Sequence, residues 1–289
     1  METHFSEMEK GRRLPVWLKM QRASGENYSR VKQITLRNKL NTICTSGNCP
    51  NIGECWNAGT ATFMILGDTC TRACKFCATK TGRPLPPDPD EPSRLAASVG
   101  ALGLKHSVIT SVDRDDLADG GAAAWAETVR TVRGANPGIT VETLIPDFDG
   151  RPGLIKMVIE SGPDIVSHNL ETVRRLTPFI RTKARYDRSL DVLRIIAGNR
   201  VVTKSGIMVG LGETVEEVYK TIDDIRDTGC KVITIGQYLK PAAGFMEPEE
   251  YIEPAMFKVY REYALKIGFD MAECSPLVRS SFHAERHVG

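Results

Sequence analysis

Six of the eight cysteines of this chain fall within one short stretch, where they form two groups of three. The first triad is spaced C-x4-C-x5-C and consists of Cys44, Cys49 and Cys55. The second triad is spaced C-x3-C-x2-C and consists of Cys70, Cys74 and Cys77. Three thiolates leave one iron of a four-iron cluster without a protein ligand, and an iron with an open position can bind a substrate or cofactor. The spacing therefore predicts two clusters, each with an open or unusual fourth ligand.

Zinc is the main alternative for cysteines grouped in this way. Structural zinc sites usually take four closed ligands from paired two-cysteine knuckles, and neither triad has an obvious fourth ligand. Disulfides are not expected, because residues 1–20 mix acids with bases and contain no secretory apolar run. We therefore expect reduced thiols with metal or redox chemistry in a cytoplasmic protein, or in an organelle if a transit peptide has been removed.

The composition is that of an ordinary globular chain. It has 289 residues, of which 41% are hydrophobic and 26% are charged, which suits one large domain or a domain with extensions. No stretch is long enough to cross a membrane. A net charge of +2 argues neither for nor against nucleic acid by itself. We expect no membrane association and no nucleic-acid partner.

The pattern of apolar residues predicts alternating strands and helices. Strands are expected at Thr62–Leu66, Ser107–Thr110, Ile139–Ile145, Ile165–His168, Val201–Val209 and Val232–Leu239. The clearest helix is Thr214–Thr228, which Thr214 and Glu217 begin with a capping box and Gly229 ends; Asp187 is expected to cap another. Six such units predict an α/β fold with a parallel sheet closed, or partly closed, into a barrel. An open doubly wound sheet would have the same pattern.

The chain divides into three segments on this pattern. Residues 1–60 hold few apolar runs and carry the first triad, so we expect an N-terminal extension there. Residues 61–240 hold the strand–helix units, and residues 241–289 form a C-terminal extension with one helix at about Pro254–Ile267. The second triad directly follows the first strand. Because active sites of α/β barrels lie at the carboxyl ends of strands, the second triad stands where an active site is expected.

Several longer motifs resemble a known family. The C-x3-C-x2-C triad, with Phe76 before its last cysteine, looks like that of the radical S-adenosylmethionine (AdoMet) enzymes. The wider motifs resemble the lipoyl synthase family, and they lie at residues 49–56, 59–72, 110–117, 168–173, 204–213 and 279–282. The resemblance runs from about Ser24 to His283. A lone C-x3-C-x2-C would indicate only the superfamily, whereas the paired triads with the serine motif near the C-terminus are highly specific.

This resemblance implies a fold, a reaction and a set of partners. The fold would be a partial (β/α)6 barrel with N- and C-terminal extensions. The second triad would hold a 4Fe-4S cluster that binds and cleaves AdoMet, and the resulting radical would abstract hydrogen from C6 and C8 of an octanoyl-lysyl group. A second, auxiliary 4Fe-4S cluster on the first triad would be consumed as the sulfur donor. The implied partners are an octanoylated lipoyl carrier domain or H protein, an electron donor such as ferredoxin or flavodoxin, and an iron–sulfur carrier for cluster repair.

The resemblance also implies cofactor contacts outside the cysteines. Candidates for the AdoMet site are Phe76, Ser111, Asn169, Glu171, Arg185 and Gly210. Asn169 and Glu171 follow the fourth strand and could bind ribose hydroxyls. Gly210 lies in a glycine-rich turn whose backbone could approach AdoMet closely, but a tight strand-to-helix turn would explain the glycine equally well. Ser281, or alternatively Ser280, would be the fourth ligand of the auxiliary cluster.

Four further features of the sequence need no chemical role, and structural explanations are preferred for them. Cys230 and Cys274 are expected to be buried apolar thiols. His168 is expected to be a core or strand-end residue rather than a metal ligand, and Asp113–Asp116 a solvated loop or helix start.

Two segments depart from the pattern of the family, and they leave the substrate open. Family members often carry acidic residues where this chain has 45–48, and residues 242–248 lack the usual basic stretch. A paralogous sulfur insertase with a different acyl substrate is therefore an alternative. A biotin-synthase-like enzyme is disfavoured by the first triad. An iron–sulfur electron carrier, a redox sensor and a zinc-stabilised binding module are the remaining alternatives, which AdoMet binding and metal analysis would separate.

Overall fold

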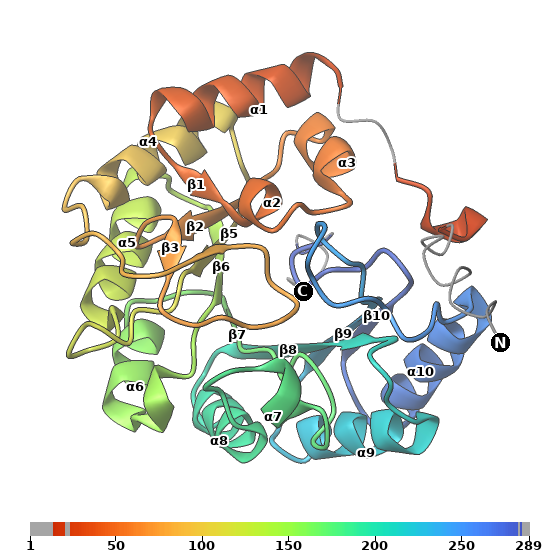
Figure 1. Cartoon of the computed structure of the whole chain (residues 1–289). Helices are drawn as coiled ribbons and strands as arrows, with labels where there is room; N and C mark the ends of the chain where they lie inside the picture. Colours follow the sequence, from red (N-terminus) through yellow and green to blue (C-terminus); the bar gives the residue numbers. More distant parts are fainter. Residues whose placement is uncertain (1–13, 21–23, 283, 285–289) are drawn as a thin grey trace, which may run out of the picture.

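The computed structural model describes residues 14–20, 24–282 and 284. Its main feature is an eight-stranded sheet in the order β1-β2-β5-β6-β7-β8-β9-β10. The strands are β1 (Asn41–Thr42), β2 (Thr62–Ile65), β5 (His106–Ser111), β6 (Thr140–Leu144), β7 (Ile165–Ser167), β8 (Val202–Val209), β9 (Val232–Gln237) and β10 (Met271–Cys274). All neighbours pair in parallel except β1, which runs antiparallel to β2. The curved sheet forms a partial barrel (Figure 1).

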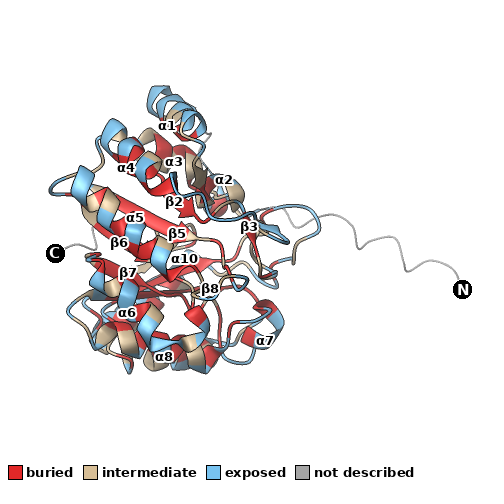
Figure 2. Ribbon diagram, turned by 90° about the vertical axis from the view of Figure 1, so that its left-hand side faces the viewer, coloured by how far each residue is buried: buried red, intermediate tan, exposed pale blue. Residues whose placement is uncertain are grey.

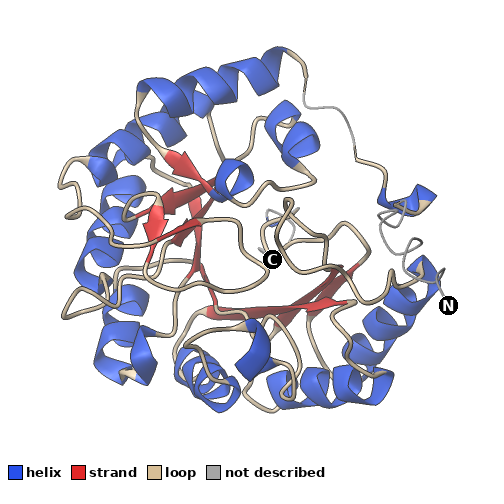
Figure 3. Ribbon diagram, in the orientation of Figure 1, coloured by secondary structure: helices blue, strands red, loops and turns tan. Residues whose placement is uncertain are grey.

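Helices surround the convex side of this sheet (Figure 3). The outer helices are α1 (Glu26–Arg37), α4 (Glu91–Leu102), α5 (Ala122–Ala135), α6 (Pro152–Glu160), α8 (Tyr186–Ala197), α9 (Val215–Arg226) and α10 (Pro254–Lys266). Shorter helices are α2 (Ile43–Ser46), α3 (Ile52–Asn57) and α7 (Thr177–Ile180), with 3₁₀ turns at η1 (Val16–Leu18) and η2 (Phe148–Gly150). Because the helices cover one side and loops fill the other, the doubly wound alternative is excluded and the partial barrel is confirmed.

Local sequence signals explain where the best helices begin. The Thr214 side chain accepts a hydrogen bond from the Glu217 N–H at 3.3 Å, and Glu217 accepts one from the Thr214 N–H at 2.9 Å, so the expected capping box begins α9. Asp187, by contrast, does not cap α8. Arg185 is the N-cap residue, and Asp187 lies in the first turn, where its carboxylate pairs with Arg174 at 2.7 Å. An acidic side chain in the first turn stabilises the helix by interacting with the helix dipole, without acting as the N-cap.

Burial on both faces explains why the strands read as short apolar runs. All residues of β2 and β9 are buried (Figure 2), because the outer helices cover one face and loops cover the other. Trp125 on α5 is fully buried in this core, and its indole N–H donates to the Ser111 hydroxyl at 3.2 Å. Cys230 is fully buried and Cys274 partly buried against the same core, as expected for apolar thiols.

Two strands of the main sheet were not expected, and both belong to the extensions. β1 pairs with β2, and β10 extends the sheet beyond β9. After β10 the chain turns back across the barrel. Val278 lies so close to β9 that a Cβ on Gly236 would stand 2.0 Å from the Val278 carbonyl oxygen, which only glycine avoids. The segment after β10 therefore packs closely against β9 at Gly236, whereas α10 of the same extension lies among the outer helices.

Candidate active site

The second triad lies on the loop that leaves the carboxyl end of β2. Cys70 ends a two-residue strand, β3 (Thr69–Cys70), which pairs in parallel with β4 (Lys80–Thr81). The Gly82 N–H donates to the Cys70 carbonyl at 3.0 Å, and the Cys77 N–H donates to the Cys74 carbonyl at 3.1 Å. The loop is therefore closed on itself, with all three cysteines held between two short strands.

The sulfur atoms of this loop lie in a buried setting with hydrogen-bond donors. The backbone N–H groups of Arg72 and Asp113 point at the Cys70 sulfur, at 3.4 and 3.3 Å. Burial, together with negative charge on Asp113 and Cys77, raises the pKa of both Cys70 and Cys74 to about 11. These two thiols are therefore protonated at neutral pH when no metal is bound. A bound metal cluster would displace these protons, and the two N–H donors would then stabilise a thiolate.

Arg72 ties this loop to two neighbouring strands. Its guanidinium group makes two hydrogen bonds to Asp115, at 2.9 and 2.8 Å, and one to Asp147 at 2.7 Å. Asp113 lies 3.3 Å away. Asp113 and Asp115 follow β5, whereas Asp147 follows β6, so one buried arginine joins three loops. Asp113–Asp116 is thus a loop with Asp115 and Asp116 exposed, as expected, but its carboxylates are also ion-paired with arginines. Sequence reasoning missed Arg72, although an arginine between two cluster cysteines was a visible signal.

Three predicted AdoMet contacts lie at the carboxyl ends of the other strands. Ser111 ends β5 and accepts from Trp125. Asn169 follows β7, and its amide donates to the Ser280 hydroxyl at 2.6 Å. Glu171 is a non-glycine residue with a positive φ of 68°, and its backbone bridges to Ile207 of β8. Burial raises its pKa. A strained, buried carboxyl group at a strand end is typical of a functional site.

The remaining three predicted contacts lie in three different environments. Phe76 packs against the apolar cluster of Ile180, Leu211 and Tyr238, so it forms part of the wall beside the triad. Arg185 is exposed at the start of α8. Gly210 has a φ of 90°, and a Cβ there would stand 2.1 Å from the Gln237 amide nitrogen. The positive φ and the close approach of Gln237 are enough to explain the glycine. This agrees with the alternative of a tight strand-to-helix turn.

His168 and Arg181 form a buried layer beneath these strand ends. One imidazole nitrogen of His168 lies 2.9 Å from the Ile145 carbonyl oxygen, and the other lies 3.0 Å from the Ser189 hydroxyl. Burial and the charge of Arg181 lower the pKa of His168 to about 4. Its ring is therefore neutral and fully hydrogen-bonded at neutral pH, which confirms the expected core role. Arg181 donates to the carbonyl groups of Asn169 and Leu170, at 3.2 Å each, and was not singled out by its sequence.

The first triad lies at the opposite end of β2. Cys44 belongs to α2, Cys55 belongs to α3, and Cys49 lies between the two helices. A cavity of about 270 Å³ is lined by all three cysteines together with Arg279 and Ser281. Burial raises the pKa of Cys44 to about 11 and also raises that of Cys49. The structure therefore brings this triad and Ser281 to one cavity. Among the residues described, no three His, Cys, Asp or Glu side chains are grouped around a position for a single metal ion.

The two serines of the C-terminal motif point in different directions. The Thr62 hydroxyl donates to the Ser281 hydroxyl at 2.7 Å, which holds Ser281 at the start of β2 beside the first triad. Ser280 instead accepts from Asn169, near the AdoMet contacts. Arg279 lies close enough to Cys49 and Glu171 for both to favour its charged form, although burial lowers its pKa. This short motif therefore runs between the two candidate sites.

A buried ion pair in the barrel interior was also missed. The Lys204 ammonium group donates to Glu142 at 2.8 Å, and both side chains are completely buried. Ser167 donates to the same carboxylate at 3.0 Å, and His106 lies 3.6 Å from its other oxygen. A lysine within an apolar strand gives no sequence signal for a partner 62 residues away. Breaking such a pair is costly, so we assign it to the fold.

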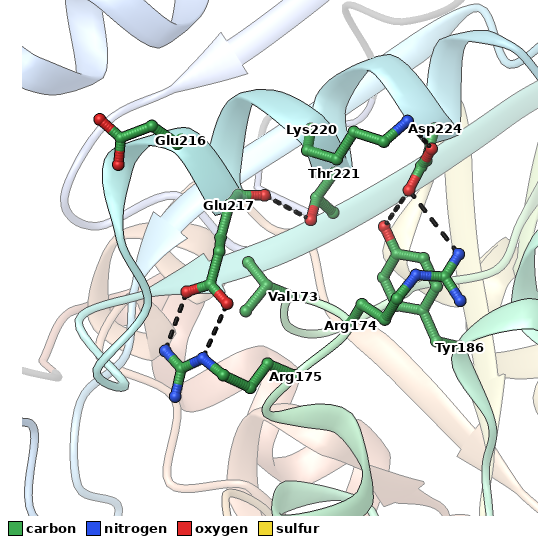
Figure 4. A pocket seen from close by; sticks show the side chains of 9 residues that line it. All are labelled: Val173, Arg174, Arg175, Tyr186, Glu216, Glu217, Lys220, Thr221 and Asp224. Atoms are coloured by element: carbon green, nitrogen blue, oxygen red, sulfur yellow. Dashed lines mark hydrogen bonds and ion pairs between the residues drawn. The ribbon is translucent and has the colours of Figure 1, made fainter.

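A second cavity, of about 430 Å³, lies between α9 and residues 173–175 (Figure 4). Most of its charged side chains form ion pairs with one another. Arg175 pairs with Glu217 at 2.8 Å, while Lys220 and Arg174 approach Asp224 at 2.7 and 3.9 Å. No cysteine lines this cavity. We assign no chemistry to it.

Comparison with known proteins defines the class first. The Radical SAM superfamily matches residues 64–225, where SAM denotes AdoMet. Methylornithine synthase (PylB) superposes with a TM-score of 0.56 at 13% identity, covering 90% of this chain and 82% of that one. SuiB from Streptococcus suis, bound to S-adenosylmethionine, superposes with a TM-score of 0.56 at 11% identity, covering 87% of this chain and 56% of that one. The chain is a member of the Radical SAM superfamily, with its partial barrel.

Relatives at much higher identity define the family. A lipoyl synthase of Bacteroides fragilis (strain YCH46) is 55% identical over 276 residues, or 96% of each chain. One of Treponema denticola is also 55% identical, over 96% of this chain and 95% of that protein. The chain belongs to the lipoyl synthase family. Membership implies a 4Fe-4S cluster and AdoMet as cofactors. Among the residues described, no helix is both long and apolar enough to span a membrane.

Proposed function

We propose that the chain inserts two sulfur atoms, at C6 and C8, into an octanoyl-lysyl group on a lipoyl carrier domain. The observation that carries this proposal is the placement of two cysteine triads at opposite ends of β2, with the C-terminal motif running between them. A radical formed at one end and a sulfur source at the other would both reach an acyl chain in the barrel. A paralogous insertase for another acyl group is the alternative.

The second triad would hold the 4Fe-4S cluster whose open iron binds AdoMet. When bound, this pair supplies a 5′-deoxyadenosyl radical by reductive cleavage of the sulfonium. Two N–H donors already directed at Cys70 favour a thiolate there. The Arg72 ion pairs hold the loop in place, and Phe76 with its apolar neighbours would exclude water from the reactive species. Ser111, Asn169 and Glu171 are the residues best placed to bind the nucleoside.

The first triad, with Ser281, would hold the auxiliary 4Fe-4S cluster that donates sulfur. Its cavity contains thiol and hydroxyl donors, which suits such a cluster with one unusual ligand. Ser281 is favoured over Ser280, because Ser281 lines the cavity whereas Ser280 is directed at Asn169. An alkoxide is a harder ligand than a thiolate and binds iron–sulfur sites less well. A labile fourth ligand would let iron leave as sulfide is extracted.

The extensions would serve mainly to build this auxiliary site. The Asn51 amide donates to the Leu277 carbonyl at 2.7 Å, and the Asn48 amide donates to the Pro241 carbonyl. These contacts support a division into N- and C-terminal extensions, residues 1–60 and 241–289, around a barrel of residues 61–240; residues 1–13, 21–23, 283 and 285–289 lie outside the described part. We propose three partners: the octanoylated carrier domain or H protein, ferredoxin or flavodoxin as electron donor, and an iron–sulfur carrier that rebuilds the auxiliary cluster.

An anaerobic reconstitution tests the proposal. The protein would be loaded with iron and sulfide, then mixed with AdoMet, a reductant and an octanoyl-lysyl peptide, and mass spectrometry would follow peptide and 5′-deoxyadenosine. A peptide that gains two sulfur atoms, with two deoxyadenosines per product, is expected. Deoxyadenosine without sulfur insertion would move the substrate to another acyl group. Neither product, from a protein loaded with both clusters, would favour an electron carrier or sensor.

A further inference from the structure

Two segments that surround the second triad carry exposed cations and no acidic residue. Residues 69–87 and 177–186 contain no Asp or Glu, although the whole chain has 36 acidic and 38 basic residues. Lys75, Lys80 and Arg83 are exposed in the first segment, and Lys183 is exposed in the second. The positive charge is therefore concentrated locally, in a protein that is nearly neutral overall.

Direct contacts join these two segments into one surface. The Lys75 N–H donates to the Ile180 carbonyl at 2.9 Å, and the Ala73 N–H donates to the Thr182 hydroxyl at 3.2 Å. The Lys75 ammonium group lies 3.1 Å from the centre of the Phe179 ring. The loop after β3 and helix α7 lie at the same end of the barrel (Figure 2). We call the exposed residues Lys75, Lys80, Arg83, Phe179 and Lys183 of these two joined segments the cation face.

The cation face has the chemical character of a protein-docking surface. Phe179 is 60% exposed and Leu85 beside Arg83 is 83% exposed, so apolar groups are interleaved with the cations. Within the described part of the chain, no carboxylate lies at ion-pair distance from Lys75, Lys80 or Arg83, while Lys183 pairs with Asp115 at 2.9 Å. Most of this charge is thus available to a partner, and interspersed charges of one sign steer an oppositely charged protein.

We propose that the cation face is the docking surface for an acidic one-electron donor protein. This inference rests on the proposed function, because it requires a cluster on the second triad. Lys75 stands between two of the expected ligands, Cys74 and Cys77, so a donor bound here would lie directly over that cluster. The donor would be oxidised by one electron and the cluster reduced by one. The carrier domain is a weaker candidate, because its acyl chain must reach between the triads inside the barrel, whereas an electron needs only to reach the ligand loop.

Charge reversal at two positions tests this docking. Lys80→Glu with Arg83→Glu changes four units of charge at residues that form no ion pair within the described part of the chain. The matched control is Lys156→Glu with Lys258→Glu, on the exposed surfaces of α6 and α10. Reduced flavodoxin would be mixed anaerobically with AdoMet-free protein, and bleaching of the cluster absorbance would be followed by stopped flow. We expect the rate at low salt to fall about tenfold or more in the first variant only, with its dependence on salt largely removed.

Reduction by dithionite separates docking from damage. The proposal requires the dithionite rate and iron content of the Lys80→Glu/Arg83→Glu variant to match those of the parent protein. An unchanged flavodoxin rate, or an equal loss in the control variant, would overturn the proposal. A higher KM for the octanoylated carrier under dithionite, with normal flavodoxin reduction, would assign the surface to the carrier instead. The reduction assay does not measure sulfur insertion. Failure of the wider function would be recognised separately, because cluster bleaching would then be absent in all proteins, including the parent.

Discussion

The two cysteine triads are built in different ways. The second triad spans eight residues, from Cys70 at the end of β3 to Cys77 in the loop before β4, and local backbone hydrogen bonds close that loop. The first triad spans two short helices and an intervening turn, and its cavity is completed by Arg279 and Ser281 from the other end of the chain. The Thr62–Ser281 hydrogen bond that completes it joins residues 219 positions apart.

This difference suits the roles proposed for the two sites. A cluster that cleaves AdoMet repeatedly must stay bound, and a compact loop held by buried ion pairs provides that stability. A cluster that is consumed must be released and rebuilt. A site assembled from two chain extensions can open at the least cost in the rest of the fold, because its ligands are not part of the main parallel strands.

Removing each triad in turn should have the largest effects and should distinguish the two sites most clearly. Replacing Cys70, Cys74 and Cys77 by Ala should abolish deoxyadenosine formation and remove about half of the bound iron. Replacing Cys44, Cys49 and Cys55 by Ala should remove a similar share of iron but retain deoxyadenosine formation, with no sulfur in the peptide. Iron analysis and mass spectrometry measure both. Deoxyadenosine from the first variant would show that the roles are assigned to the wrong triads.

The Arg72 ion pairs allow a test of how firmly the second triad is held. Arg72→Ala leaves Asp113, Asp115 and Asp147 without their shared cation, so we expect a loss of about 3–5 kcal/mol in the free energy of unfolding. Urea unfolding of the cluster-free protein measures it. The matched control is Arg114→Ala, because Arg114 is equally buried but pairs with Asp116 alone. Similar losses in both variants would contradict a special role for the three-carboxylate arrangement.

Acid should act on the layer beneath the second triad through His168. Its folded pKa of about 4 lies below the ordinary value of 6.5, so the unfolded chain binds a proton more readily than the folded one. The contribution of His168 to the free energy of unfolding is therefore fully present above pH 6.5. It is lost as the pH drops towards 4, by up to about 3 kcal/mol. Unfolding free energies measured across this range should depend less on pH in His168→Gln. An identical pH dependence in that variant would assign the effect to other groups.

The smallest effects on stability, and the finest comparison, come from the two serines. Ser280→Ala and Ser281→Ala each remove one side-chain hydrogen bond, so each should cost about 1 kcal/mol. Only Ser281→Ala should alter the auxiliary cluster, which the electron paramagnetic resonance spectrum of the reduced protein would report. Ser281→Cys should retain the cluster but impair sulfur insertion. An unchanged yield of lipoyl product from Ser281→Cys would refute the labile-ligand explanation.

Short-range patterns predicted much of the architecture. The six expected strands all form, and α9 begins with the capping box that Thr214 and Glu217 indicate. β1 and β10 were missed because each is too short to show a periodic pattern, and pairing with β2 and β9 makes them strands. Asp187 was wrongly expected to cap α8, since a cap depends on backbone geometry that the residue type alone does not fix.

The sequence by itself determined the second triad, because three cysteines within eight residues must share one loop wherever that loop lies. It also determined a parallel α/β sheet, through repeated apolar runs at strand length, but not whether that sheet curves into a barrel. Only the tertiary structure decided which charges meet Arg72, which serine reaches the first triad, and which cations form one face. Those groups come from segments that become neighbours only when the sheet curves and the C-terminal extension returns across it. The spacing of residues within one segment does not encode the distance in space between such segments.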